Sequence, residues 1–418
     1  MPDYNEELTR KWEEKYSPSV IEEKKEENEY REGLKALSEE ILPLTETTPD
    51  FNRIVTGDGY KEKVSTGFDG IDLALNGGLS PRLYLIAADT GRGKSTLAWN
   101  IAQNIARQTA RTRAAYEALP EEERKETMPP KERSVLYFLL EMSAQELFAR
   151  AISRRMLERN DGLPEKNVVL PLTEDQILYN FQNPDEVTDE QRAVFGIEEA
   201  KFIQAEAKYL YVIEGRKTVE EIETYIDAFQ MKQRAIDYPP IVIVDYLQIL
   251  APTTDENGKQ LIRDPRLQVD HNTTEFEKIK NSKGTPIIII SSVTKQGQGS
   301  LEVDITDLKE SGQISFDVDC IITLNPTLTK EQEAILNKAR TSDERAESKK
   351  KIKEKQMTEY PRKMTVRFEK NRGGIPNFKA GMLYFSAHYA LFDDPENGQK
   401  TPPVYTGDQI RPPKRAPF

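Results

Sequence analysis

The residues of this chain best suited to chemistry lie in one short run between an apolar segment and a helical pattern. Glycine-rich turns in that position present backbone N–H groups that wrap phosphate oxygens, with a helix N-terminus behind them. The following lysine, Lys94, can reach the β- and γ-phosphates, and the hydroxyl of Ser95 can bind Mg²⁺. Ala88 stands where the pattern GxxxxGK[ST] has its first glycine. The run therefore predicts a site for a nucleoside triphosphate with Mg²⁺, formed by Ala88, Asp89, Thr90, Gly91, Arg92, Gly93, Lys94, Ser95 and Thr96.

Two carboxylates follow apolar runs and are candidates to complete this site. Asp245 closes the run 241–244, which is the pattern of a strand whose terminal acid holds Mg²⁺ through water. Glu141 closes the run 135–140, and we expect this strand to lie beside the phosphate-binding loop, at the sheet edge where ligands bind. There its carboxylate can act as a general base on the attacking water. The alternative is an ordinary solvated glutamate at a strand end, and the spacing alone favours this second interpretation.

The elements that position these residues are read from the hydrophobic pattern. From about Val64 short apolar runs alternate with helical stretches, which is typical of an α/β fold with a parallel sheet. The early runs are nearly continuous Val, Ile and Leu, as expected for strands covered on both faces. We therefore expect a mostly parallel sheet with strands at 83–88, 135–140, 209–213, 241–244, 286–290, 320–324, 364–368 and 382–385.

Charge and proline content divide the chain further. The first 50 residues carry 15 acidic and 7 basic side chains, and they contain an apolar stripe at helical spacing. This arm is either a solvated helix or a helix that docks on another subunit. We expect a helical arm or linker at 1–50, an ATPase domain at 51–400 and a Pro-rich tail at 401–418, with charged insertions near 107–133, 155–205 and 329–360. The stripe consists of Tyr30, Leu34, Leu37 and Ile41.

Composition excludes several classes of protein. The 418 residues are 37% hydrophobic and 31% charged, no run approaches a membrane span, and the acidic N-terminus is unlike a signal peptide. One cysteine, Cys320, and two histidines, His271 and His388, exclude a disulfide framework and a zinc finger. The net charge of −12 argues against a protein that coats nucleic acid, although a local basic channel is compatible with it. We expect neither secretion nor membrane insertion.

Beyond the phosphate-binding loop, further motifs occur in the order found in DnaB-type replicative DNA helicases, the superfamily 4 helicases with a RecA-like core. The chain resembles that family over about residues 64–392. Most of the usual N-terminal domain of bacterial members has no counterpart, which favours a compact phage- or plasmid-type member. The motifs that carry the resemblance are 66–72 with 77–79, 140–144, 244–248, 307–312 and 370–374.

The resemblance implies a RecA-like P-loop NTPase core that assembles as a homohexamer and binds ATP between neighbours. It identifies Glu141 with the catalytic glutamate of the family. Arg372, with Lys370 beside it, resembles the basic pair that reaches a neighbour's γ-phosphate, an arginine finger; by themselves these residues would pass as a basic hairpin turn. The resemblance further implies that single-stranded DNA in the central channel is gripped by the loop containing Lys309, Glu310 and Gly312.

The function implied is that of an ATP- and Mg²⁺-dependent helicase, which moves 5′→3′ on single-stranded DNA and unwinds duplex DNA at the replication fork. Primase and a helicase loader are further implied partners, and the cytoplasm, or the host cytoplasm for a phage protein, is the expected location. The alternative is a RecA-fold ring ATPase of the recombinase or clock type that unwinds nothing. A third class is an ATPase-impaired scaffold that holds primase or the loader.

Two features leave alternatives open. Family members usually have Ser-Gln after the strand 286–290, where the glutamine senses the γ-phosphate, but this chain has Ser291-Ser292. Either Thr294 or Gln296 substitutes, or coupling between hydrolysis and DNA movement is altered. The basic insertion 329–360 is either a solvated surface helix or a contact for DNA or a loader.

Overall fold

The computed structural model describes residues 25, 32, 35, 63–161, 163–232, 239–255, 259–293, 300–308, 314 and 316–394. It divides into two compact units, 1–62 and 63–418. In the first unit only Lys25, Glu32 and Lys35 are described, and each is helical and exposed. The apolar stripe of the arm and the Pro-rich tail lie outside the described residues, so both predictions about them stay predictions.

A single sheet of nine strands forms the centre of the second unit, counted over the residues that the structure describes. Its spatial order is β3-β2-β4-β5-β1-β6-β7-β8-β9. The six strands from β3 to β6 are parallel, and β7, β8 and β9 continue the sheet antiparallel. The strands are β1 (Leu83–Ala88), β2 (Val135–Leu139), β3 (Leu210–Glu214), β4 (Ile241–Asp245), β5 (Ile287–Ser292), β6 (Cys320–Pro326), β7 (Arg362–Asn371), β8 (Phe378–Ser386) and β9 (Leu391–Asp393).

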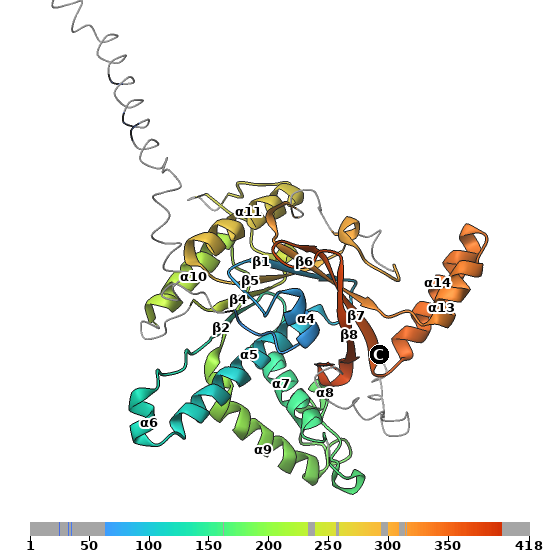
Figure 1. Ribbon diagram of the computed structural model, residues 1–418. Helices are drawn as coiled ribbons and strands as arrows, with labels where there is room; N and C mark the ends of the chain where they lie inside the picture. The colour runs from blue at the N-terminus through green and yellow to red at the C-terminus, as the bar shows by residue number, and fades with distance from the viewer. Residues whose placement is uncertain are drawn as a thin grey trace, which may run out of the picture. The chain divides into compact units, whose positions relative to one another are not determined.

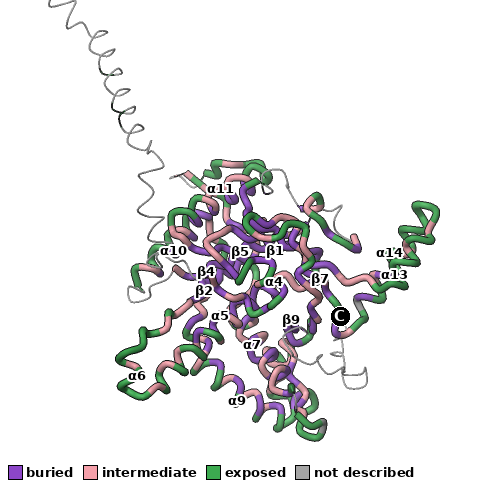
Figure 2. Tube along the Cα trace, viewed as in Figure 1, coloured by how far each residue is buried: buried purple, intermediate pink, exposed green. Residues whose placement is uncertain are grey.

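Helices cover both faces of the parallel part, which explains why β1, β2 and β4 are buried at every position. Leu83 and Leu85 of β1 pack with α10 (Val219–Lys232) and α11 (Pro265–Lys283), whereas Tyr84 and Ile86 pack with α5 (Lys94–Glu117) and α7 (Ala144–Glu158). Figure 2 shows the buried sheet between these more exposed helices. The α/β fold with a mostly parallel sheet is confirmed, and every predicted strand is present.

The remaining helices are α4 (Asp69–Ala74), α6 (Glu121–Glu126), α8 (Glu174–Leu178), α9 (Asp189–Ala205), α13 (Lys330–Lys338) and α14 (Ser342–Thr358) (Figure 1). The segment 107–133 begins inside α5, because that helix continues to Glu117 before α6 starts. No helix in the described part of the chain has both the length and the apolar character needed to cross a membrane.

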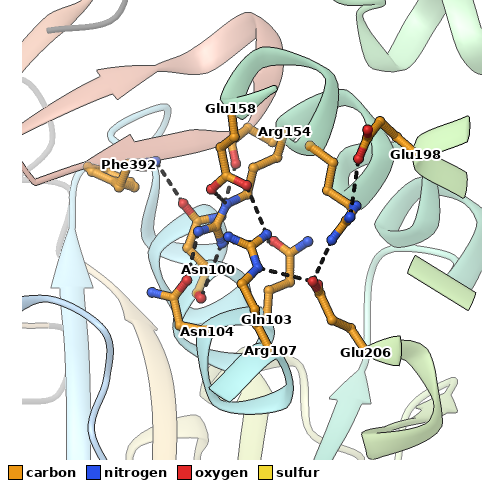
Figure 3. Close-up of polar contacts among 11 residues, drawn as sticks. Asn100, Gln103, Asn104, Arg107, Arg154, Glu158, Glu198, Glu206 and Phe392 are labelled. Atoms are coloured by element: carbon orange, nitrogen blue, oxygen red, sulfur yellow. Dashed lines mark hydrogen bonds and ion pairs between the residues drawn. The ribbon is translucent and has the colours of Figure 1, made fainter. Parts of the chain in front are cut away.

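A largely buried network of ion pairs connects α5, α7 and the residue that follows α9 (Figure 3). Arg107 of α5 binds Glu158 of α7 at 2.8 Å and Glu206, just after α9, at 3.0 Å. Arg154 of α7 binds Glu158 at 2.8 Å. Burial alone would raise the pKa of Glu158, but Arg154 and Arg107 lower it to about 2, so the carboxylate stays ionised. The helix that follows the phosphate-binding loop is thereby fixed to the helix that follows Glu141.

Candidate functional site

The loop between β1 and α5 has the backbone conformation of an anion-binding turn. Gly91 and Gly93 have φ values of 74° and 88°, in the left-handed region that glycine adopts without strain. Gly93 is the N-cap of α5, and a Cβ atom there would lie 2.7 Å from the ring of Phe392. The first turn of α5 carries no acidic side chain. Its free N–H groups and helix dipole therefore favour a negatively charged group above the loop.

Lys94 bends back across this loop. Its Nζ donates to the carbonyl oxygens of Ala88, at 2.9 Å, and Asp89, at 3.2 Å. Burial lowers the pKa of Lys94, while the carboxylates of Asp245 and Asp89 oppose that shift. An ammonium hydrogen-bonded only to neutral carbonyls can form a stronger, charge-assisted hydrogen bond with a phosphate oxygen.

Ser95 and Asp245 meet at the carboxyl edge of the sheet. The Ser95 hydroxyl donates to Asp245 Oδ1 at 3.1 Å, and the hydroxyl of Tyr137, in β2, donates to Oδ2 at 3.2 Å. Burial raises the pKa of Asp245, although both hydrogen bonds lower it in part. A hydroxyl and a carboxylate oxygen side by side are ligands that Mg²⁺ accepts. The residues present thus fit a magnesium ion beside the phosphate-binding loop.

Glu141 follows β2 and is exposed. The expectation that its strand lies beside the loop is wrong, because β4 and β5 stand between β2 and β1. The cause is long-range pairing, in which Leu139 lies opposite Asp245 and the N–H of Leu140 donates to the Asp245 carbonyl at 3.1 Å. Glu141 still raises the pKa of Lys94 by its charge. The carboxylate is therefore on the same edge as the loop, next to Asp245.

Arg92 points into the protein instead of towards this edge. Its guanidinium donates to Asn325 Oδ1 of β6 at 3.0 Å and to the carbonyl of Ser300, and it lies 3.8 Å from the Asp89 carboxylate. The N–H of Thr90 donates to Asp89 Oδ1 at 2.8 Å. The side chains of Asp89 and Arg92, together with the buried Thr96, therefore hold the shape of the loop. The backbone of the loop faces the carboxyl edge of the sheet.

Lys370 and Arg372 lie at the opposite edge of the sheet. The Arg372 N–H donates to the Asp319 carbonyl at 2.9 Å, and Arg372 Nη1 is 3.4 Å from Asp319 Oδ1. Asp319 Oδ2 in turn accepts from the N–H of Leu83, the first residue of β1, at 2.9 Å. The phosphate-binding loop follows the last residue of the same strand. Five steps of about 3.3 Å place the two edges roughly 16 Å apart, so Arg372 is remote from the loop 88–96 of the same chain.

The predicted DNA-binding residues Lys309, Glu310 and Gly312 lie outside the described residues. The chain beyond them is described at Phe316, which is exposed. Its carbonyl accepts from Lys370 Nζ at 3.2 Å and from Arg372 Nη2 at 2.7 Å. The basic pair is thus bonded to a residue that follows Gly312 closely in the sequence.

Two further residues at the carboxyl edge were not predicted, Tyr137 and Gln248. Gln248 Nε2 donates to Ser291 Oγ at 2.8 Å, and its Oε1 accepts from the N–H of Ser292 at 3.2 Å. Ser292 is the register partner of Ala88, where the phosphate-binding loop starts. An amide side chain therefore lies at Ser292, where family members usually have glutamine, but it comes from the turn after β4. Thr294 and Gln296 lie outside the described residues. The sequence offered one signal for Tyr137: its hydroxyl is a polar group within the apolar run 135–140, and such a group needs a hydrogen-bond partner.

Comparison with known proteins gives consistent matches. A family model described as the DnaB-like helicase C terminal domain matches residues 63–394. A curated replicative DNA helicase DnaB from Mycoplasma genitalium is 24% identical over 278 residues, which are 65% of this chain and 48% of the relative. Another, from Rickettsia bellii, is 23% identical over 292 residues, which are 69% of this chain and 50% of the relative. The chain spans about half the length of these curated relatives.

Two solved structures have the same fold. The first, a structure of an ATPase domain, has a TM-score of 0.56 at 18% identity, with 84% of this chain and 97% of that chain covered. The second, a DnaB-like replicative helicase from a structure that also concerns its interactions with primase, has a TM-score of 0.56 at 17% identity. It covers 85% of this chain, and 67% of that chain is covered. At these identities the two structures support the fold alone.

Proposed function

Because this chain belongs to the DnaB-like helicase family, as the match over residues 63–394 shows, we propose that it is an ATP-dependent DNA helicase of the replicative type. The proposed motor is a homohexamer with single-stranded DNA in its central channel. It moves 5′→3′ on that strand, displaces the other strand, and works in the cytoplasm, or in a host's cytoplasm if a phage encodes it. Primase is a proposed partner, as in the related helicase structure, and a loader is another.

One observation carries the proposal: nucleotide-binding groups and the basic pair lie at opposite edges of one sheet. Lys94, Ser95 and Asp245 gather at the carboxyl edge, whereas Arg372 is held at the amino edge through Asp319. A site completed by a neighbour's arginine needs this separation. The arrangement suits subunits that stack edge to edge in a closed ring, where each interface holds one ATP.

Within that interface each side chain has a proposed role. The loop 88–96 binds the triphosphate, with Lys94 on the β- and γ-phosphates. Ser95 and Asp245 would hold Mg²⁺, Asp245 through water, and the ion would neutralise charge on the phosphate oxygens. Glu141, solvent-accessible on the same edge, takes a proton from the attacking water. Arg372 and Lys370 stabilise the charge that develops on the γ-phosphate bound to the neighbour.

The DNA contact is proposed for the loop with Lys309, Glu310 and Gly312. Support comes from its connection, since Phe316 beyond the loop is bonded to both Lys370 and Arg372. A displacement of the basic pair by γ-phosphate would therefore act directly on the segment that leaves the DNA loop. We propose that this contact couples hydrolysis to movement of the strand.

Strand displacement tests the proposal. A forked duplex with a labelled strand is incubated with the protein, ATP and Mg²⁺. Matched duplexes that carry only the 5′ tail or only the 3′ tail determine the direction of movement. We expect unwinding that needs the 5′ tail and disappears in Lys94→Ala. ATP hydrolysis without strand displacement would favour the recombinase or clock type of ring, and absence of DNA-stimulated hydrolysis would favour the scaffold.

A further inference from the structure

The inserted helices α13 and α14 connect β6 to β7. The pair lies beside β7 and extends away from the sheet in Figure 1. Most of α14 is exposed and highly charged, as expected for a solvated surface helix. Its second half is different, because Ile352 and Gln356 are buried. This part of the insertion packs against the nucleotide-binding end of the molecule.

Two cations from this region contact the phosphate-binding loop. Lys353 Nζ of α14 lies 3.3 Å from Asp89 Oδ2. Arg362, at the start of β7, donates from Nη1 to the carbonyl of Gly91 at 3.1 Å. A cavity of only about 30 Å³ remains between the loop and α14, lined by Asp89, Thr90, Lys353 and Gln356 among others. The loop is therefore held from the side by the insertion as well as by β1 and α5.

The contact between Lys353 and Asp89 matters because of where the Asp89 carboxylate lies. Asp89 is buried, and a buried carboxylate needs cations or donors around it. Arg92 lies 3.8 Å away, but its guanidinium is directed mainly to Asn325 and Ser300. The Asp89 charge also acts on Lys94, whose pKa it raises. Without Lys353, less positive charge would offset the Asp89 carboxylate. Asp89 would then attract Lys94 more strongly, and Lys94 is the ammonium that the phosphates need.

We propose that Lys353 is a positioning residue for ATP: through Asp89 it keeps the phosphate-binding loop and Lys94 in the conformation that accepts the triphosphate. The inference rests on the proposed function of this loop. It assigns a role to the insertion, which becomes a lateral support of the nucleotide site. The exposed first half of α14 then lies on the same helix as a residue that affects ATP affinity.

Equilibrium binding of a fluorescent ATP analogue, followed by steady-state hydrolysis, tests the proposal on the full chain. Lys353→Ala should weaken binding and raise KM for ATP by about three- to tenfold, the scale of a charge pair with one buried partner, with kcat within about twofold. Lys353→Arg should restore most of the affinity. Lys350→Ala, an exposed lysine on the same helix, is the matched control and should bind like wild type.

A double-mutant cycle separates positioning from general damage. In an Asp89→Asn background, Lys353→Ala should add no further loss of affinity, because the partner charge is already absent. Equal losses in both backgrounds, or wild-type affinity in Lys353→Ala, would overturn the inference and leave the proposed function intact. If Lys353→Ala fails to fold, Lys353→Met keeps the alkyl stem and the same cycle applies. A wild-type chain that binds no ATP would refute the proposed function and this inference with it.

Discussion

Replacing Arg372 by alanine distinguishes a site completed by a neighbour from a self-contained one. The roughly 16 Å between the sheet edges limits what this charge can do for its own subunit's nucleotide. At that distance a unit charge contributes about 0.3 kcal/mol in water and about 1 kcal/mol at an effective dielectric constant near 20. The corresponding rate effect is at most about fivefold. Direct contact with a neighbour's γ-phosphate is instead worth roughly 10³- to 10⁵-fold.

We therefore expect Arg372→Ala to bind ATP normally and to lose at least about 10³-fold in hydrolysis. The fold should survive, because the Arg372 side chain is half exposed and the buried Asp319 keeps its ion pair with Lys280 at 2.9 Å, so losing the Arg372 pair should cost only about 1 kcal/mol. The assay mixes Arg372→Ala with Lys94→Ala, both nearly inactive alone. At equal amounts about one quarter of the interfaces join an intact loop to an intact arginine, so activity should return towards that fraction. Subunit exchange without any return, or only a fivefold loss in Arg372→Ala, would refute the reasoning.

Three further substitutions test the carboxyl edge. Glu141→Gln should keep ATP binding and lose about 10²-fold or more in turnover, the effect of a positioned general base; loss of binding in a filter assay would indicate a structural role instead. Tyr137→Phe removes a donor that lowers the pKa of Asp245, which burial already raises. The neutral carboxyl then persists to higher pH and binds Mg²⁺ poorly, so the acid limb of kcat/KM against pH should move upward; an unmoved limb contradicts the assignment. Gly93→Ala places a Cβ 2.7 Å from Phe392 at a φ of 88° and should cost about 2–4 kcal/mol of unfolding free energy, measured by denaturant titration; wild-type stability would show that the loop can relax.

Local patterns in the sequence predicted the strands well, and the loop 88–96 has the backbone shape expected of the proposed phosphate-binding turn. Each buried strand is a continuous apolar run, and the loop needs only neighbours in sequence to adopt its shape. The same locality explains the error about Glu141. Which strand lies beside β1 depends on pairings such as Leu83 with Ile287, and an apolar run carries no information about its partner.

The contacts that the insertion 329–360 makes with the loop could not be predicted from the sequence, for a related reason. Lys353 meets Asp89 across 264 positions, and the helix that carries it shows almost no apolar stripe to predict a docked face. Gln248 was visible within a motif, but its bonds to Ser291 and Ser292 depend on β4 and β5 being neighbours. In both cases the missing information was long-range, and only the assembled sheet supplied it.

If Arg372 acts on a neighbour's nucleotide, as proposed, its separation from the loop determines how many complete sites an assembly has. In an assembly built this way, complete sites belong to contacts between subunits and not to the subunits themselves. A closed ring has as many working sites as members, whereas a ring opened at one contact to admit a DNA strand has one fewer. The subunit at that gap can still bind ATP but lacks the arginine to hydrolyse it. ATP bound there would not be hydrolysed until the gap closes, so unhydrolysed ATP at one position would mark the open state.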